Sequence, residues 1–313
     1  MSKKWYSLVF LIYSNQFNQN LLFMLKAFSS TYRFITRINL AWGLISTILI
    51  FTIYSISAET TQNSTSLPGG VSPAFNTRVL EVISKMPVGG EYAVSRTAAQ
   101  ALRNSITLDD KGQLSINEAS ATPSFCSGAV YLVLLRALKP EIDAIKDNTT
   151  RQKLIRSLTV AGQADGVGIW GRWNSNGPGM AVTFIEAEMG RSSWDFKSAI
   201  PGDFLKLWWT ESIGSKEAGH SVVFLGFKKA ENGEDGVEFW SSNKPGGYGK
   251  KVVAFSKIKH ALVTHCEHPS KVTEFLRLEQ KNVFLADMLN RETTPDEINK
   301  KILMSNLTPR KIR

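Results

Sequence analysis

Cys126 is the residue of this sequence whose setting best suits nucleophilic chemistry. It stands in the segment PSFCSG (residues 123–128), which precedes an apolar run over residues 129–138. The proline and serine of this segment are typical of a helix start, and a run that is apolar nearly all round is typical of a buried helix. We therefore expect Cys126 near the first turn of a buried helix, where unpaired amides and the helix dipole favour the thiolate. A small buried core residue is the alternative interpretation of this cysteine.

A cysteine nucleophile needs a base, and the base needs a group that orients it. Of the four histidines in the sequence, His220 follows a glycine turn and heads an apolar segment typical of a strand. On the next expected strand, the two-residue period places Ser241 and Asn243 on one face. Asn243 can accept the imidazole N–H and hold its tautomer, as a Cys-His-Asn site requires, and Ser241 is the second candidate. Taken alone, His220 is better explained as a surface residue at a strand end.

Residues 162–180 combine many glycines with two tryptophans and two asparagines. Such a composition is unsuited to a helix or a regular strand, so we expect a long ordered loop. Loops of this kind often form the wall of a binding site. Trp173, Asn174 and Asn176 are therefore candidate substrate contacts. The alternative is a surface loop whose tryptophans cover an edge of the core.

The elements that must position these residues change type along the chain. Helical patterns cover residues 73–86, 95–104, the segment after Cys126, and 149–161, where Thr149 or Thr150 is the expected cap. After Pro-Gly-Asp at 201–203, short β-branched and aromatic segments separated by turns predict an antiparallel meander over residues 204–209, 221–227, 237–242 and 251–255. Helices first and a sheet second predict an α+β fold. Residues 270–290 and the segment after Thr294 carry two further helical patterns.

The N-terminal segment does not read as part of this fold. Residues 40–56 are apolar and uncharged, basic residues precede them, and small residues follow them. This pattern predicts a secretory signal within residues 1–58, of ordinary length if translation starts at Met24 rather than Met1. An uncleaved membrane anchor is the alternative, because the apolar run is near the lower limit of about 17 residues for a membrane span. In both cases we expect the rest of the chain to be exported, periplasmic or extracellular.

The remaining boundaries follow from composition and charge. Residues 59–72 are polar and predict a linker, residues 73–268 form the expected catalytic domain, and residues 269–313 form a C-terminal helical tail. The formal net charge of +10 is concentrated in the two ends of the chain and gives little support to nucleic-acid binding. Outside residues 40–56 we expect no membrane contact. The two cysteines, Cys126 and Cys266, cannot form a disulfide framework, and the sequence does not decide whether they pair.

Three motifs in order carry a resemblance to a known group of enzymes. Cys-Ser-Gly opens a helix, Pro-Gly-Asp leads a strand, and Gly-His-Ser-Val-Val-Phe-Leu-Gly begins the next one. This order, over about residues 122–245, resembles the NlpC-type cell-wall cysteine peptidases and the related CHAP amidases. The resemblance implies a papain-like fold whose cysteine helix packs on an antiparallel sheet. It also implies that a monomer with Cys126 as nucleophile and His220 as base cleaves an amide bond in peptidoglycan peptides, with no cofactor.

The sequence departs from the family pattern at several positions. Phe125 stands where the family usually has aspartate, and the third member is not the histidine common there, which leaves Asn243 or Ser241. Tyr92 is the candidate for the family's upstream tyrosine. A transglutaminase-like acyltransferase and a catalytically idle wall-binding domain are the alternative functions. The segment HCEH (residues 265–268) fits no tetrahedral spacing, so we expect no metal site.

Overall fold

Residues 73–307 are described by a computed structural model and belong to one unit, Pro68–Arg313. The expected signal or anchor over residues 1–58 and the expected linker over residues 59–72 lie outside the described residues. Across residues 73–307, no helix is both long enough and apolar enough to cross a lipid bilayer.

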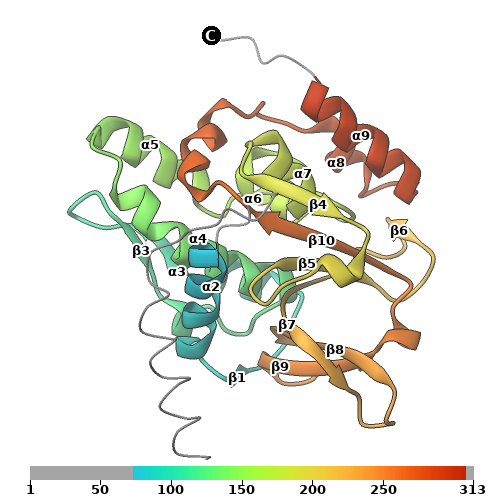
Figure 1. Ribbon diagram of the computed structural model, residues 1–313. Coiled ribbons are helices and arrows are strands. Elements are labelled where there is room, and N and C mark those ends of the chain that lie inside the picture. Colours follow the sequence, from blue (N-terminus) through green and yellow to red (C-terminus); the bar gives the residue numbers. More distant parts are fainter. Residues whose placement is uncertain (1–72, 308–313) are drawn as a thin grey trace, which may run out of the picture. The chain divides into compact units, whose positions relative to one another are not determined.

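An antiparallel sheet of seven strands forms the centre of this unit (Figure 1). The order across the sheet is β1-β9-β8-β7-β5-β10-β4, and each neighbouring pair runs antiparallel. The strands are β1 (Gly89–Gly90), β4 (Gly190–Ser193), β5 (Phe204–Trp208), β7 (His220–Lys229), β8 (Asp235–Asn243), β9 (Gly247–Ala254) and β10 (His260–Cys266). Together with the helices, the sheet confirms the predicted α+β class.

The expected meander is the run of neighbours β5, β7, β8 and β9. The strand β10 was not predicted, although it pairs with β5 in the middle of the sheet. It also pairs with β4, which forms the edge. The segment HALVTHC has a histidine near each end, and burial between two neighbouring strands stabilises it as a strand.

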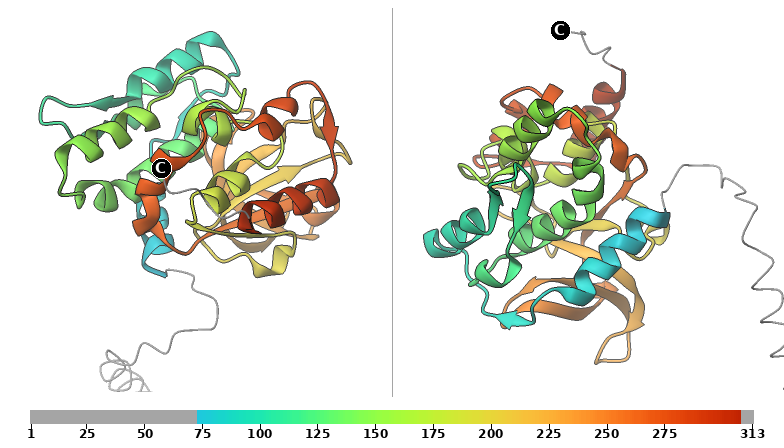
Figure 2. Two further views of the ribbon diagram at one scale, coloured as in Figure 1. Left: turned by 90° about the horizontal axis from the view of Figure 1, so that it is seen from above. Right: turned by 90° about the vertical axis from the view of Figure 1, so that its left-hand side faces the viewer.

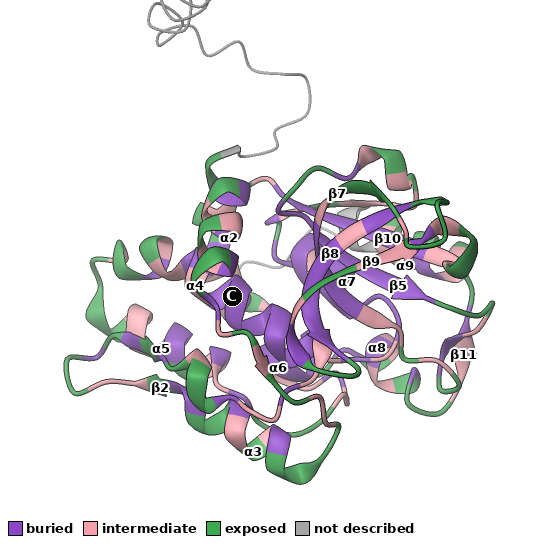
Figure 3. Ribbon diagram, turned by 90° about the horizontal axis from the view of Figure 1, so that it is seen from below, coloured by how far each residue is buried: buried purple, intermediate pink, exposed green. Residues whose placement is uncertain are grey.

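The N-terminal helices gather on one side of the sheet (Figure 2). They are α2 (Pro73–Lys85), α3 (Arg96–Ser105), α4 (Cys126–Asp143) and α5 (Asn148–Leu158), and a hairpin of β2 (Ile106–Leu108) and β3 (Leu114–Ile116) accompanies them. The N-cap of α5 is Asp147, two residues before Thr149 and three before Thr150, the two predicted caps. Because α4 is buried along most of its length, its apolar run forms the centre of the main core (Figure 3).

Residues 162–180 contain one short helix and the start of a second that continues to residue 186, and are not the single long loop that was expected. The helices are α6 (Gly168–Trp173) and α7 (Gly179–Glu186). The rings of Trp170 and Trp173 lie 5.2 Å and 5.7 Å from the ring of Tyr131 in α4. Burial of these indoles stabilises helical turns that the glycines by themselves disfavour.

The C-terminal segment packs onto α4, α5 and α7. The predicted helix over residues 270–290 is instead a 3₁₀ segment (Pro269–Arg277) and the short helix α8 (Val283–Asp287), whereas α9 (Pro295–Leu307) begins as predicted. Strand β11 (Glu292–Thr293) pairs with β6 (Ile213–Gly214) in a separate small sheet.

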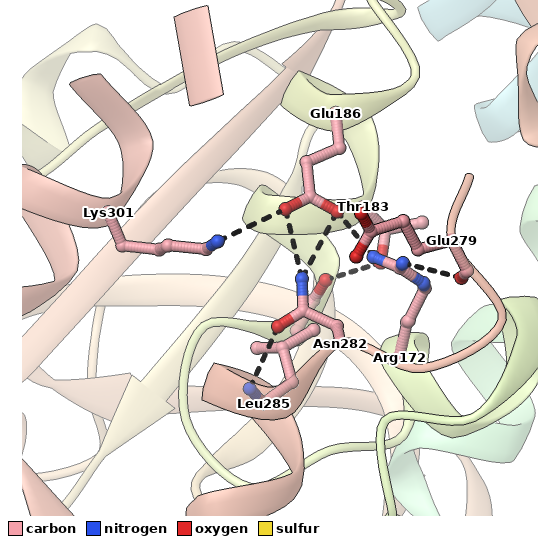
Figure 4. A network of polar contacts seen from close by, with 8 residues as sticks. Arg172, Thr183, Glu186, Glu279, Asn282, Leu285 and Lys301 are labelled. Atoms are coloured by element: carbon pink, nitrogen blue, oxygen red, sulfur yellow. Dashed lines mark hydrogen bonds and ion pairs between the residues drawn. The ribbon is translucent and has the colours of Figure 1, made fainter. Parts of the chain in front are cut away.

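A buried arginine fixes the C-terminal segment to α6 and α7 (Figure 4). The guanidinium of Arg172 pairs with Glu186 and donates to the carbonyl of Glu279 at 2.7 Å. The amide of Asn282 donates to both carboxylate oxygens of Glu186, at 2.9 Å and 3.1 Å. Lys301 of α9 lies 3.7 Å from the same carboxylate. One carboxylate therefore joins four segments of the chain.

Candidate active site

Cys126 is the first residue of α4, as the sequence predicts. The preceding residue, Phe125, is the N-cap and makes no side-chain capping bond, so the first-turn amides are not occupied by a side-chain cap. Ser124 is held on two sides: its hydroxyl donates to Ser242 on β8 at 2.8 Å, and its amide donates to the carbonyl of Glu91 at 3.0 Å. The backbone that carries the thiol is therefore fixed against both the sheet and the segment after β1.

His220, the first residue of β7, interacts directly with the Cys126 thiol. Burial by itself raises the pKa of that thiol. The charge of His220 and a hydrogen bond from it, the charge of Lys206 and a backbone hydrogen bond from Ser221 outweigh burial and lower the pKa of Cys126 to about 6. Both Cys126 and His220 are only half-buried. The thiolate is therefore the main form of Cys126 at neutral pH, beside an imidazole that solvent can reach.

Asn243, the last residue of β8, contacts the imidazole. Its Oδ1 lies 3.3 Å from Nε2 of His220, while its amide nitrogen donates to the carbonyls of Gly249 at 2.9 Å and Ser241 at 3.2 Å. Since both donor positions of the amide face carbonyls, Oδ1 is the atom left to accept from the imidazole. His220 then carries its proton on Nε2 and leaves Nδ1 to exchange a proton with the sulfur.

Ser241 does not contact the imidazole. Its hydroxyl is buried and donates to the carbonyl of Ser221 at 2.7 Å. The hydroxyl of this second candidate for the orienting group is therefore used in a hydrogen bond to the backbone of the neighbouring strand β7. The imidazole is instead flanked by two rings, those of Phe239 at 5.7 Å and Trp209 at 6.1 Å.

Tyr92 faces the sulfur from the segment after β1. Burial, the charge of Cys126 and a hydrogen bond with Cys126 raise the pKa of Tyr92 to about 12. Its hydroxyl therefore keeps its proton and remains a donor toward the sulfur across the physiological range. The motif Gly-Gly-Glu-Tyr was the sequence signal for this residue, and the short parallel bridge between Tyr92 and Ser124 brings it to the site.

Lys206, on β5, is a residue of the site that sequence reasoning missed. Its side chain is 4% exposed, and its Nζ lies 3.4 Å from the hydroxyl of Ser221. Burial lowers the pKa of Lys206, and the charge of Cys126 acts in the opposite direction. The available signal was a lysine in the middle of the otherwise apolar segment FLKLW.

The three predicted substrate contacts have different fates. Trp173 is fully buried and donates its indole N–H to the carbonyl of Ser127 at 3.1 Å, so it supports α4 and the prediction of a substrate contact is wrong. Asn174 is half-buried and accepts a hydrogen bond from the hydroxyl of Ser127, the residue after Cys126. Asn176 donates to the carbonyl of Met288 at 3.3 Å and so binds the C-terminal segment. Only Asn174 remains beside the site.

His265 has a structural role. Nδ1 of His265 lies 2.9 Å from Oδ2 of Asp203, and both side chains are buried. Asp203, from the Pro-Gly-Asp motif, also accepts from the amide of Ile200 at 2.8 Å and from Asn76 at 3.0 Å. Across residues 73–307, no three His, Cys, Asp or Glu side chains are grouped to hold a metal ion. Cys126 and Cys266 are both free thiols and are not paired with each other.

Three comparisons with known proteins, against family models, curated proteins and solved structures, gave no match to this chain.

Proposed function

We propose that this chain is an exported cysteine hydrolase of papain-like, NlpC-type architecture that cleaves an amide bond in peptidoglycan peptides. The observation that carries the proposal is the direct interaction of the Cys126 thiol with His220, residues that lie far apart in the sequence. The contact between His220 and Asn243 supplies the orienting group that such a pair requires. A cysteine kept only for packing has no need of an imidazole, an amide and a tyrosine around its sulfur.

The first chemical step uses the pair as nucleophile and base. The Cys126 thiolate attacks the carbonyl carbon of the substrate amide, and the proton of the thiol resides on Nδ1 of His220. Negative charge moves to the carbonyl oxygen, where the first-turn amides of α4 and the hydroxyl of Tyr92 are the available donors. His220 then protonates the leaving amine, the C–N bond breaks, and a thioester to Cys126 remains.

The second step releases the acid product. A water molecule gives a proton to His220 and attacks the thioester carbonyl, and the C–S bond breaks to restore the thiolate. Asn243 keeps the imidazole in one tautomer through both steps. No metal or cofactor takes part in the sequence of bonds formed and broken.

The choice of substrate rests on the resemblance of the Cys-Ser-Gly, Pro-Gly-Asp and Gly-His-Ser-Val-Val-Phe-Leu-Gly motifs to those of the cell-wall peptidases. The order of elements supports it: the cysteine begins a buried helix and the histidine begins a strand of an antiparallel sheet. The N-terminal sequence predicts export, which would bring the protein to a cell wall.

Incubation of the purified full-length protein with peptidoglycan, followed by mass analysis of released fragments, tests the proposal. We expect new amino and carboxyl ends at one peptide bond. Cys126→Ala and His220→Ala should release none above background, whereas Cys266→Ala, which removes the other thiol, should release them normally. Equal digestion by the parent and Cys126→Ala would exclude this function. Products that carry an added amine instead of water would identify acyl transfer.

A further inference from the structure

Lys206 places its side-chain amine inside the core, 3.4 Å from the hydroxyl of Ser221, the residue after His220. It lies on the central strand β5, between Ser221 of β7 and Leu262 of β10 in the sheet register. Its neighbours on the same face, Phe204 and Trp208, are fully buried. A lysine at such a position is uncommon, because transfer of an unpaired ammonium from water into a protein interior is costly.

The surroundings of Lys206 do not offer a carboxylate. Among the residues that the structure describes, its one hydrogen-bond contact is the hydroxyl of Ser221 at 3.4 Å, and it forms no ion pair with Asp or Glu. A single neutral hydroxyl cannot balance a buried positive charge. The group of opposite charge that acts on Lys206 is the sulfur of Cys126. The charge of the sulfur raises the pKa of Lys206, against the effect of burial, and the charge of Lys206 lowers the pKa of Cys126.

The backbone at the start of β7 is shaped around the lysine. Gly219 directly precedes His220, and a Cβ atom at this position would lie 2.8 Å from Cε of Lys206 and 2.7 Å from Nε1 of Trp208. A side chain there would displace the indole of Trp208 or the end of Lys206, and the positive φ of Gly219 also favours glycine. The next residue but one, Ser221, makes a backbone hydrogen bond to Cys126 and contacts Lys206 through its hydroxyl. The lysine and the sulfur therefore share one short segment of β7.

We propose that the Lys206 ammonium is a second counter-ion of the Cys126 thiolate, which stabilises it from within the core while His220 does so at the surface. The inference rests on the proposed function in taking Cys126 as the nucleophile. Lys206 is a positioning residue in this scheme, since it acts on the charge of the sulfur and does not touch the substrate. Its positive charge would favour the free thiolate before the attack on the substrate, and again when the C–S bond breaks and the thiolate is restored.

Three titratable groups act on the sulfur, each from a different segment: His220 from β7, Lys206 from β5, and Tyr92 from the segment after β1. The contribution of the lysine can be isolated from that of the histidine by changing one at a time. His220→Ala should therefore leave a thiol that still ionises below the pH of an ordinary cysteine, and Lys206→Met should remove part of the remaining effect.

The experiment measures the rate of iodoacetamide alkylation of Cys126 against pH in the full-length protein. In the parent we expect a midpoint near pH 6. Lys206→Met should move the midpoint up by about one pH unit, which lowers the alkylation rate at pH 6 about fivefold. Lys228→Met is the matched control: it removes an exposed lysine from the far end of β7 and should leave the midpoint unchanged.

Two further variants keep the test decisive. Lys206→Gln retains a polar partner for Ser221 but removes the charge, so it should shift the midpoint as Lys206→Met does, and it replaces that variant if Lys206→Met fails to fold. In Cys126→Ala the lysine has lost its counter-ion, so Lys206→Met should raise the melting temperature of Cys126→Ala more than that of the parent. This double-mutant comparison requires no enzyme activity.

A midpoint in Lys206→Met and Lys206→Gln within about 0.3 pH unit of the parent would overturn the inference, as would an equal shift in Lys228→Met. The peptidoglycan assay separates this result from the proposed function. Hydrolysis by the parent with an unchanged midpoint in the lysine variants would leave the hydrolase intact and remove the counter-ion. A shifted midpoint in the lysine variants, with no hydrolysis by the parent, would support the counter-ion and exclude the hydrolase.

Discussion

His220, at the start of β7, and Asn243, at the end of β8, lie opposite each other, with Nε2 of the histidine 3.3 Å from Oδ1 of the asparagine. This contact follows from the register of β7 and β8, in which Val223 pairs with Trp240. Three residues outward from that pair, the two antiparallel strands bring His220 and Asn243 together. A β-bulge between Phe224 and Gly226 shifts the register between this pair and the turn that joins β7 to β8. The orienting contact of the site therefore depends on where the bulge is placed.

The two candidates for the orienting group are separable by mutation. Asn243→Ala should lower kcat/KM on the order of 100-fold, because the imidazole loses the acceptor that holds its tautomer. Ser241→Ala is the matched control, since the serine hydroxyl donates to the carbonyl of Ser221 and not to His220. It should cost about 1 kcal/mol of unfolding free energy and leave kcat/KM nearly unchanged. Steady-state kinetics with urea unfolding measures both, and a larger kinetic loss in Ser241→Ala would reverse the assignment.

Tyr92→Phe should lower kcat about 100-fold with little change in KM, because the phenol is available as a donor to charge that develops near the sulfur. The control is Tyr248→Phe, whose hydroxyl donates to the carbonyl of Ala121 at 2.8 Å and supports the fold. That variant should unfold at lower urea concentration yet retain its kcat. Equal kcat in the parent and Tyr92→Phe would remove the tyrosine from the mechanism.

The two thiols should differ sharply in reactivity. The pKa of Cys126 is lowered to about 6, so its thiolate fraction rises as pH increases through 6 and is nearly complete at pH 7.5. Burial raises the pKa of Cys266, which stays protonated and covered. Brief iodoacetamide treatment at pH 7 should therefore add one label, located at Cys126 by peptide mass analysis. Cys266 should react only after denaturation, and labelling of both thiols at equal rates would contradict this prediction.

Arg172→Met should lower the free energy of unfolding by about 3 kcal/mol, because it leaves the carboxylate of Glu186 without its buried partner. Arg277→Met is the control: its ion pair with Glu274 is exposed, and its loss should cost less than about 1 kcal/mol. Urea unfolding measures both. Similar losses in the two variants would show that the Arg172 network of Figure 4 contributes no more than a surface pair.

The sequence by itself predicted the features that depend on neighbours along the chain. Cys126 begins a helix because a helix-start signature precedes a long apolar run. Strands β5, β7, β8 and β9 follow from β-branched and aromatic runs between turns. The placement of His220 at a strand start, and of Asn243 on the next strand, follows from the same local pattern.

Only the tertiary structure decided how distant segments meet. The sequence does not distinguish Trp173 from a binding-site residue. Packing against the rings of Tyr131 and Phe204, which are distant in sequence, is what buries it. Ser241 and Asn243 share a strand face, and the register of β7 and β8 places Asn243, not Ser241, opposite the imidazole. Lys206 meets the hydroxyl of Ser221 only because β5 pairs with β7. Burial, register and charge pairing are set by residues far apart in the sequence, so no local pattern encodes them.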